Sequence, residues 1–201
     1  MWTGLVFAGG ASTRMGSDKA LLVVGGTTLV ARAVATVRAA GGDPLVLTPP
    51  RPPAAIAGAR QLDESDGAGP GGPLPALRRG LAACGPGATA VALACDLPLV
   101  PPALLRDLAA QPGTWDAAVP RAGGVLQVMA AAYRGGCLGA IDRALLRGDR
   151  SLVGWLDDVD LRVLDEGALA SYGGAAVFLN VNAPADRERA ETALAARGSG
   201  A

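Results

Sequence analysis

Four polar segments contain residue types that could together bind and activate a nucleoside triphosphate. The first is a glycine-rich, basic loop, in which Gly9 and Gly10 follow an apolar run and are followed by Arg14 and Lys19. Glycine lets the main chain turn with positive φ and approach a ligand closely, and successive N–H groups in such a turn bind anions. Arg14 and Lys19 add positive charge where a polyphosphate would lie. The loop therefore predicts a triphosphate site.

The glycine spacing of this loop differs from those of the two commonest phosphate-binding loops. A Walker A loop has Gly, four residues and then Gly-Lys-Ser/Thr, whereas five residues separate Gly10 from Gly16, and Ser17 comes next. A dinucleotide-binding loop has Gly-x-Gly-x-x-Gly, whereas Gly9 and Gly10 are adjacent. Judged from its glycines alone, the loop could equally be an ordinary turn between a strand and a helix.

The second segment places Asp96 at the end of a predicted buried strand and two residues before Pro98. Mg²⁺ is usually bound by one or two carboxylates together with phosphate oxygens and waters. Asp96 is therefore a candidate Mg²⁺ ligand, with a turn-forming aspartate as the alternative. The neighbouring Cys95 is better explained as a small buried residue than as a nucleophile.

Two further segments could contact a nucleotide or its acceptor. Asn180 and Asn182 follow a predicted strand over 176–179. Asn182 could bind substrate or metal, or could cap the next helix. Asp63 precedes a glycine-rich helix start at Gly72, and its carboxylate could accept hydrogen bonds from a purine amino group. An exposed loop aspartate is the alternative for Asp63.

Composition excludes several classes of function. The 201-residue chain has 18 basic and 18 acidic residues, which offers no electrostatic attraction to nucleic acid or to an anionic membrane. No apolar run is long enough to span a bilayer, and we see no signal peptide. We therefore expect a cytoplasmic protein that binds neither nucleic acid nor membrane.

The cysteine and histidine counts limit the kinds of catalytic and metal site that the chain can form. Three scattered cysteines form no Cys-x-x-Cys pair, so neither a disulfide framework nor a zinc site is indicated. The chain contains no histidine, which excludes histidine-based triads and the HExxH zinc site. Phosphoryl-type transfer fits this composition, because it depends on positioning and charge neutralisation.

Apolar runs typical of strands alternate with stretches of helical periodicity, which predicts a parallel sheet covered on both faces. Such sheets bind ligands at the carboxyl ends of their strands, near a switch in strand order, so the Gly9 loop and Asp96 can face one crevice. We expect one domain over residues 1–196 and a disordered tail over 197–201. The expected strands are 5–8, 45–48, 60–62, 90–94, 117–120, 125–133, 162–164 and 176–179, and the expected helices are 28–40, 74–83, 102–110, 138–146, 151–156 and 186–196.

In order and spacing, four strings of the sequence resemble the molybdenum cofactor guanylyltransferases over nearly the whole chain. They are residues 8–22, 72–74, 95–98 with the prolines at 101 and 102, and 178–184. The resemblance implies an α/β fold, a Rossmann-like three-layer αβα sandwich with a mostly parallel sheet, as in nucleotide-diphospho-sugar transferases. It also implies a Mg²⁺-dependent nucleotidyltransferase that joins GMP from GTP to molybdopterin-bound molybdenum and releases pyrophosphate.

The same resemblance assigns roles to residues of this chain. Lys19, Arg14 and Asp96 would be catalytic, Asp96 would hold Mg²⁺, and Asn180 and Asn182 would face the pterin substrate. The nucleotide-binding residues would be Phe7, Ala8, Gly9, Gly10, Lys19, Thr48, Asp63, Gly72, Pro73, Leu74 and Asp96. The acceptor's phosphate is already an anionic nucleophile, so the reaction needs no strong general base, which fits the absence of histidine.

The implied partners are GTP, molybdopterin or the molybdenum cofactor, and, transiently, cofactor-biosynthesis proteins or molybdoenzyme chaperones. A molybdopterin cytidylyltransferase or another small-molecule nucleotidyltransferase is the alternative enzyme. Ala8-Gly9-Gly10 favours guanine, because the cytidylyl members tend to have Ala-Ala-Gly at this turn. A non-catalytic NTP-binding module is the alternative from another class, and the combination of Arg14, Lys19 and Asp96 disfavours it.

Overall fold

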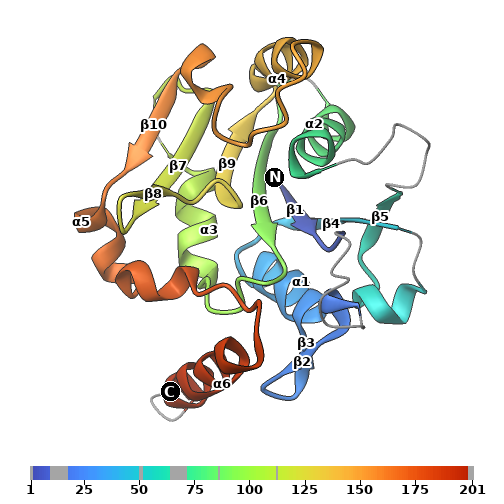
Figure 1. Ribbon diagram of the computed structural model, residues 1–201, viewed down its shortest axis with the longest axis vertical. Coiled ribbons are helices and arrows are strands. Elements are labelled where there is room, and N and C mark those ends of the chain that lie inside the picture. Colours follow the sequence, from blue (N-terminus) through green and yellow to red (C-terminus); the bar gives the residue numbers. More distant parts are fainter. Residues whose placement is uncertain are drawn as a thin grey trace.

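A mixed sheet runs through the centre of the protein in the order β10-β7-β9-β6-β1-β4-β5, with β8 paired to β7 (Figure 1). This computed structural model describes residues 2–9, 18–49, 52–63, 72–85, 87–111 and 113–198. Most neighbouring strands are parallel, but β9 runs antiparallel between β6 and β7. The strands are β1 (Thr3–Phe7), β4 (Asp43–Thr48), β5 (Arg60–Asp63), β6 (Thr89–Ala94), β7 (Ala117–Ala122), β8 (Val125–Leu126), β9 (Ala130–Arg134) and β10 (Leu161–Leu164).

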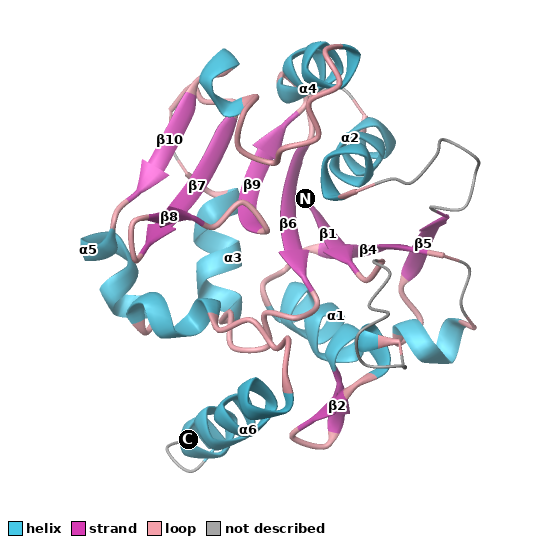
Figure 2. Ribbon diagram, in the orientation of Figure 1, coloured by secondary structure: helices cyan, strands magenta, loops and turns pink. Residues whose placement is uncertain are grey.

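Helices cover both faces of the sheet, as the alternating pattern predicts (Figure 2). The helices α1 (Leu29–Ala39) and α3 (Pro102–Ala109) pack on one face, and α2 (Pro73–Cys84) and α4 (Cys137–Leu146) pack on the other. Successive residues of β1 alternate between the two cores, because side chains of a strand point to opposite faces. The expected three-layer α/β architecture is confirmed.

The switch in strand order lies beside β1. The chain passes from β1 to β4 and β5 on one side and then returns to β6 on the other, and all these neighbours are parallel. Phe7 at the end of β1 pairs with Ala94 at the end of β6, and Cys95 N donates to Phe7 O at 3.1 Å. The carboxyl ends of β1 and β6 therefore meet where such folds bind ligands.

Helix α2 approaches the sheet closely because it contains a glycine on its buried face. A Cβ at Gly80 would lie 2.8 Å from Leu5 Cδ1 and 3.3 Å from Leu47 Cδ1, so a larger residue would push the helix away from β1 and β4. At the N-terminus of α2, Gly72 adopts φ +129°, which side chains disfavour, and Pro73 occupies the first turn, where proline is tolerated. These residues set the position of the helix start.

Three of the expected elements are wrong. The stretch 151–156 is not a helix: bends and turns lead into a short 3-10 helix (Leu156–Asp158), and Gly154, a poor helix former, lies within the stretch. The stretch 176–179 is not a strand, since a 3-10 helix (Gly174–Phe178) replaces it, and Val177 and Phe178 are buried by packing rather than by strand pairing. The stretch 125–133 is interrupted by a turn between β8 and β9.

A small hairpin and the last helix complete the fold. Strands β2 (Val23–Val24) and β3 (Thr27–Thr28) are joined through glycines with positive φ, and Arg32 of α1 donates to Val24 O at 2.6 Å. Helix α6 (Pro184–Gly198) continues past the expected end at 196, and residues 199–201 of the expected tail lie outside the described residues. The remaining short helices are η2 (Lys19–Leu21), η3 (Pro53–Ile56), η4 (Leu156–Asp158), α5 (Glu166–Leu169) and η5 (Ala170–Tyr172). Among the described residues, no helix has the length and apolar character needed to cross a bilayer.

Candidate active site

The ammonium of Lys19 lies at the meeting point of three segments that are far apart in the sequence. Its Nζ is 2.6 Å from Asp96 Oδ2, 2.5 Å from Asn182 Oδ1 and 3.4 Å from Asn180 Oδ1. Lys19 begins η2, where the side chain of Asp18 accepts from Ala20 N at 3.1 Å. The structure thus brings together four residues that the sequence singled out separately, and we call these four residues the Lys19 cluster.

The two asparagines reach the same ammonium from either side of one buried residue. The backbone between them is fixed by Val181, whose N–H donates to Asp96 O at 2.9 Å and whose side chain is buried. With Val181 turned inward, Asn180 and Asn182 both direct their side-chain oxygens to Lys19. Side chains two residues apart in an extended segment lie on the same side of the chain, so the spacing of the two asparagines suits a common partner.

The start of α6 is capped by Asp186 rather than through the side-chain oxygen of Asn182, which contacts Lys19. Asp186 Oδ2 accepts from Asn182 N at 3.1 Å and from Ala183 N at 3.0 Å. An acidic side chain that accepts these N–H groups also offsets the positive end of the helix dipole. Asp186 therefore holds the backbone of Asn182 at the start of the helix.

We expect Asp186→Ala to lower the free energy of unfolding by about 1 kcal/mol, because it leaves two N–H groups at the start of α6 without their acceptor. Urea denaturation measures this change. Glu188→Ala is the matched control, because it removes one exposed carboxylate from the same helix without touching its start. Equal stability of the two variants would contradict the capping role.

The donor set of the Lys19 cluster fits a hard divalent cation. Asp96 Oδ1 is buried and has no hydrogen-bond partner in the structure as described, although buried carboxylate oxygens are normally paired. Asp96 and the two asparagines offer oxygen ligands, which Mg²⁺ prefers. Within the described ranges no three His, Cys, Asp or Glu side chains gather to hold a metal. A metal ion here would therefore have Asp96 as its carboxylate ligand and would need oxygens from a substrate or from water.

The predicted nucleotide-binding residues line the carboxyl ends of adjacent strands. Phe7 and Ala8 are buried at the end of β1, and Gly9 is exposed directly after them. Thr48 pairs with Asp63 at the ends of β4 and β5, and Asp63 is exposed. Gly10 and Arg14, with the rest of 10–17, lie outside the described residues.

Thr48 is oriented toward the protein interior. Its side chain is fully buried, and Oγ1 donates to Ala8 O at 3.3 Å. The hydroxyl thereby ties the end of β4 to Ala8, the residue that follows β1. At the start of α2, Gly72 and Pro73 are exposed, whereas Leu74 is fully buried in the same core as Phe7.

The cysteines are not placed or tuned for nucleophilic chemistry. All three are free, and Cys95 is only 8% exposed. Burial raises the pKa of the Cys137 thiol to about 12 and raises the pKa of the Cys84 thiol above its ordinary value. Because the thiolate is the reactive form, Cys84 and Cys137 are structural at neutral pH.

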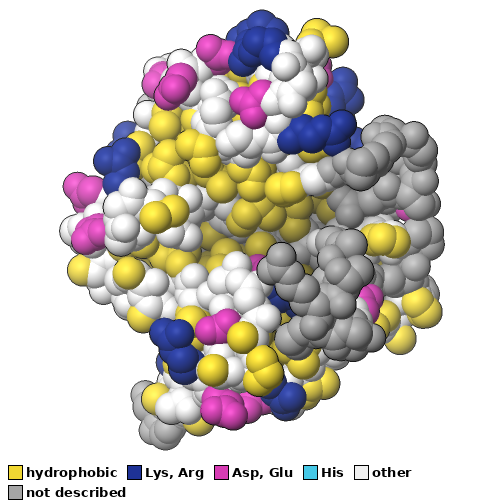
Figure 3. Space-filling view, in the orientation of Figure 1, with side chains coloured by type: hydrophobic (Ala, Val, Ile, Leu, Met, Phe, Trp, Pro, Cys, Tyr) yellow, Lys and Arg dark blue, Asp and Glu magenta, His cyan; other side chains and the backbone are white. Residues whose placement is uncertain are grey.

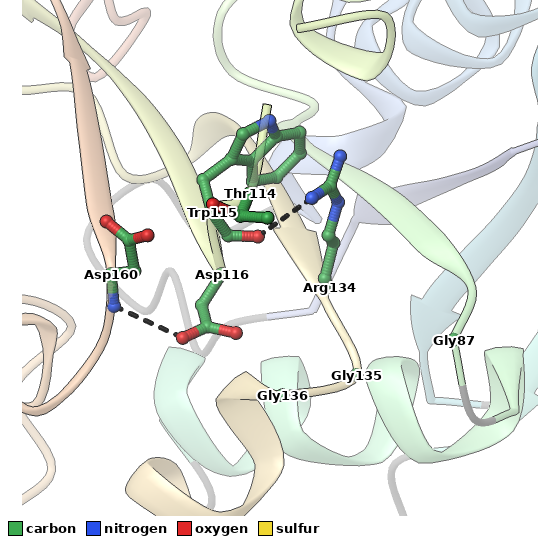
Figure 4. Close-up of a pocket in the computed structure, with 8 residues that line it drawn as sticks. All are labelled: Gly87, Thr114, Trp115, Asp116, Arg134, Gly135, Gly136 and Asp160. Carbon is green, nitrogen blue, oxygen red and sulfur yellow. Dashed lines mark hydrogen bonds between the residues drawn. The ribbon is translucent and has the colours of Figure 1, made fainter. Parts of the chain in front are cut away.

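A depression of about 430 Å³ lies at the amino ends of β7 and β10, at the opposite end of these strands from their carboxyl ends (Figure 4). The Arg134 guanidinium stacks 3.7 Å from the centre of the Trp115 ring, and Asp116 Oδ2 accepts from Asp160 N at 3.1 Å. These residues adjoin the amino ends of β7 and β10, whereas Asp96 follows the carboxyl end of β6. The depression is therefore separate from the Lys19 cluster, and the sequence analysis singled out none of its residues.

The surface near the strands is apolar on one side. In Figure 3, hydrophobic side chains gather across the middle of the drawn face, over β6, β7 and β9, and charged side chains lie toward its rims. The half-buried Met129 accepts through its backbone oxygen from Ala94 N at 2.9 Å, and Ala94 lies two residues before Asp96 in the sequence.

Comparison with known proteins shows which family the chain is similar to. Residues 4–161 match the profile of the MobA-like NTP transferase domain. The chain is 32% identical over 190 residues to a probable molybdenum cofactor guanylyltransferase of Pelotomaculum thermopropionicum, which covers 94% of this chain and 91% of that protein. A probable molybdenum cofactor guanylyltransferase of Natronomonas pharaonis is 34% identical, over 96% of this chain and 98% of its own length.

Among solved structures, the fold is similar to that of molybdopterin-guanine dinucleotide biosynthesis protein A from Archaeoglobus fulgidus. The TM-score is 0.79 at 21% identity, and the superposition covers 96% of this chain and 99% of the other. At this level of identity the likeness establishes the fold alone.

Proposed function

Because the chain belongs to the MobA-like NTP transferase domain family, we propose that it transfers GMP from GTP to the phosphate of molybdopterin and releases pyrophosphate. The observation that carries this proposal is the Lys19 cluster, which lies beside the turn at Gly9. A cation, a carboxylate and two amides at the switch point of an α/β sheet are the groups that positioning and charge neutralisation require.

The nucleotide would lie across the carboxyl ends of β1, β4 and β5. Backbone groups at Ala8, Gly9 and Gly10 would contact its phosphates, with Arg14 adding charge. Asp63 is exposed at the end of β5 and could accept from the guanine amino group. Thr48 would act through its hydrogen bond to Ala8 O, by fixing the turn that holds the phosphates. The start of α2, where Gly72 and Pro73 are exposed above the buried Leu74, would lie against the base.

Asp96 would hold Mg²⁺, which when bound neutralises phosphate charge and makes the α-phosphorus easier to attack. Lys19, with Arg14, would stabilise the negative charge that grows on the phosphate oxygens and on the departing pyrophosphate. The acceptor's phosphate attacks as an anion, so no side chain has to remove a proton.

The acceptor would lie on the side of Asn180 and Asn182. Their amides can hydrogen-bond the polar edge of a pterin, while the apolar surface over β6, β7 and β9 can cover its ring (Figure 3). In this arrangement the Lys19 cluster separates the nucleotide side of the sheet from the acceptor side.

The proposed function is tested by pyrophosphate release from the full chain with molybdopterin as acceptor. With Mg²⁺ present, we expect GTP to be used at least about tenfold faster than CTP, because the base contacts are made by fixed hydrogen-bonding groups. Faster use of CTP would favour the cytidylyltransferase alternative. No pyrophosphate with any of the four common triphosphates would favour the non-catalytic module, and omission of the acceptor and chelation of the metal are the controls.

A further inference from the structure

Lys19 is the only lysine in the sequence; all the other residues counted among its 18 basic ones are arginines. The two side chains are not equivalent. An ammonium is a compact charge with three donors, whereas a guanidinium is a planar fork suited to bidentate contacts. The chain therefore has its one ammonium at the position where three oxygens surround the charge.

All three donors of this ammonium can be used within the protein. They meet Asp96 Oδ2, Asn182 Oδ1 and, at a longer distance, Asn180 Oδ1. This arrangement leaves Lys19 without a donor for a phosphate. The ammonium also places a positive charge at the point where the carboxylate and amide oxygens of the Lys19 cluster converge. Mg²⁺ prefers oxygen ligands of this kind.

We propose that, in the nucleotide-free protein, the Lys19 ammonium occupies the cation position of the metal site, and that a divalent ion reaches Asp96 only when the ammonium moves away. Two cations on the same carboxylate would repel each other strongly in this partly buried place. The phosphates of an arriving nucleotide would offer the ammonium a new anionic partner. This inference rests on the proposed function for its metal and its nucleotide.

The structure allows such a movement at low cost to the fold. The side chains of Lys19 and Asp96 are 19% and 21% exposed, so the ion pair can separate without opening the core. The four-carbon stem of lysine is flexible. Asp96 itself is held from the other side, because its backbone carbonyl accepts from Val181 N.

The first test measures Mn²⁺ binding to the full chain without nucleotide, by the loss of the free-ion signal in electron paramagnetic resonance. We expect Lys19→Met to bind Mn²⁺ at least about tenfold more tightly than the natural chain, since it removes the competing charge. Arg162→Met is the matched control, because it removes one exposed charge from β10 at the far edge of the sheet. Adding Asp96→Asn to Lys19→Met should abolish the gain. Equal or weaker binding by Lys19→Met than by the natural chain would overturn the proposal.

The second test uses the natural chain, so it does not depend on the folding of a variant. Labelling with [¹⁵Nζ]lysine gives a single ammonium resonance, because Lys19 is the only lysine. During a Mg²⁺ titration without nucleotide, this resonance should shift in step with the occupancy of the metal site. Metal binding at Asp96 that leaves the resonance in place would contradict the proposal.

Neither test involves GTP or molybdopterin. If the metal measurements contradict the expectation, Lys19 does not occupy the cation position of the metal site, and the transferase proposal is unaffected. Absence of pyrophosphate release would remove the transferase proposal while the metal measurements could still succeed.

Discussion

Lys19→Ala is expected to lower the rate of pyrophosphate release by about 10²- to 10³-fold, the cost of removing one preorganised charge-stabilising donor from a transition state. Lys19 is the described residue whose cation lies nearest to Asp96, at 2.6 Å. Steady-state turnover with saturating GTP and acceptor measures the effect. Because the Lys19 and Asp96 side chains are only 19% and 21% exposed, the melting temperature of the variant is measured alongside turnover to check that the fold persists.

Lys19→Arg is the sharper companion of this variant. It keeps the positive charge, but replaces a compact ammonium on a flexible stem with a bulkier planar guanidinium, which places its charge differently against a phosphate. We expect it to restore less than about a tenth of the natural turnover. Arg162→Ala, in an exposed position on β10, should retain full activity. Near-natural turnover of Lys19→Ala, with an unchanged melting temperature, would refute the catalytic role of Lys19.

Asp96→Asn is expected to abolish metal-dependent transfer, with a loss of at least about 10³-fold at millimolar Mg²⁺. The substitution keeps the size of the side chain but removes the anionic ligand, and its amide presents two donors where the carboxylate offered acceptors. The buried Oδ1 of Asp96, which has no partner in the described structure, is the atom that this change affects most. Turnover measured against Mg²⁺ and Mn²⁺ concentration reports the effect.

The control for this variant is Asp142→Asn, the same chemical change on α4, where the carboxylate pairs with Arg78 at the surface. It should leave the metal dependence untouched. GTP-induced thermal stabilisation of Asp96→Asn, measured without metal, tests whether the nucleotide still binds. An unchanged dependence of turnover on Mg²⁺ in Asp96→Asn would remove Asp96 from the metal site.

Local sequence patterns were reliable where the physical cause is itself local. Thr28 precedes an apolar stripe of period 3.6 and caps α1 by accepting from Ala31 N, and Pro73 lies in the first turn of α2. A continuous apolar run before Gly9, and another before Asp96, became the buried strands β1 and β6. These signals also placed both segments at the carboxyl ends of strands.

Local patterns gave a wrong prediction where apolar residues are buried without strand pairing. Most of the run at 176–179 belongs to the 3-10 helix Gly174–Phe178, which begins at two glycines, Gly173 and Gly174, with positive φ. Val177 and Phe178 are buried in the core, and burial alone does not distinguish a strand from a tight helical turn. The antiparallel direction of β9 could not be predicted from its local sequence either, because strand pairing depends on residues far away in the sequence.

The amino-acid sequence by itself determined which groups are available: a single ammonium at Lys19, a carboxylate at Asp96 after a strand, two amides near the last helix, and no imidazole. Only the tertiary structure decided that these groups meet. The contact between Lys19 and Asn182 spans 163 residues. It forms because the chain returns to β6 beside β1, which brings Asp96 close to the end of β1. Val181 then holds the asparagine segment against Asp96 through the hydrogen bond to Asp96 O. Such a meeting depends on the packing of whole elements, which no short stretch of sequence encodes.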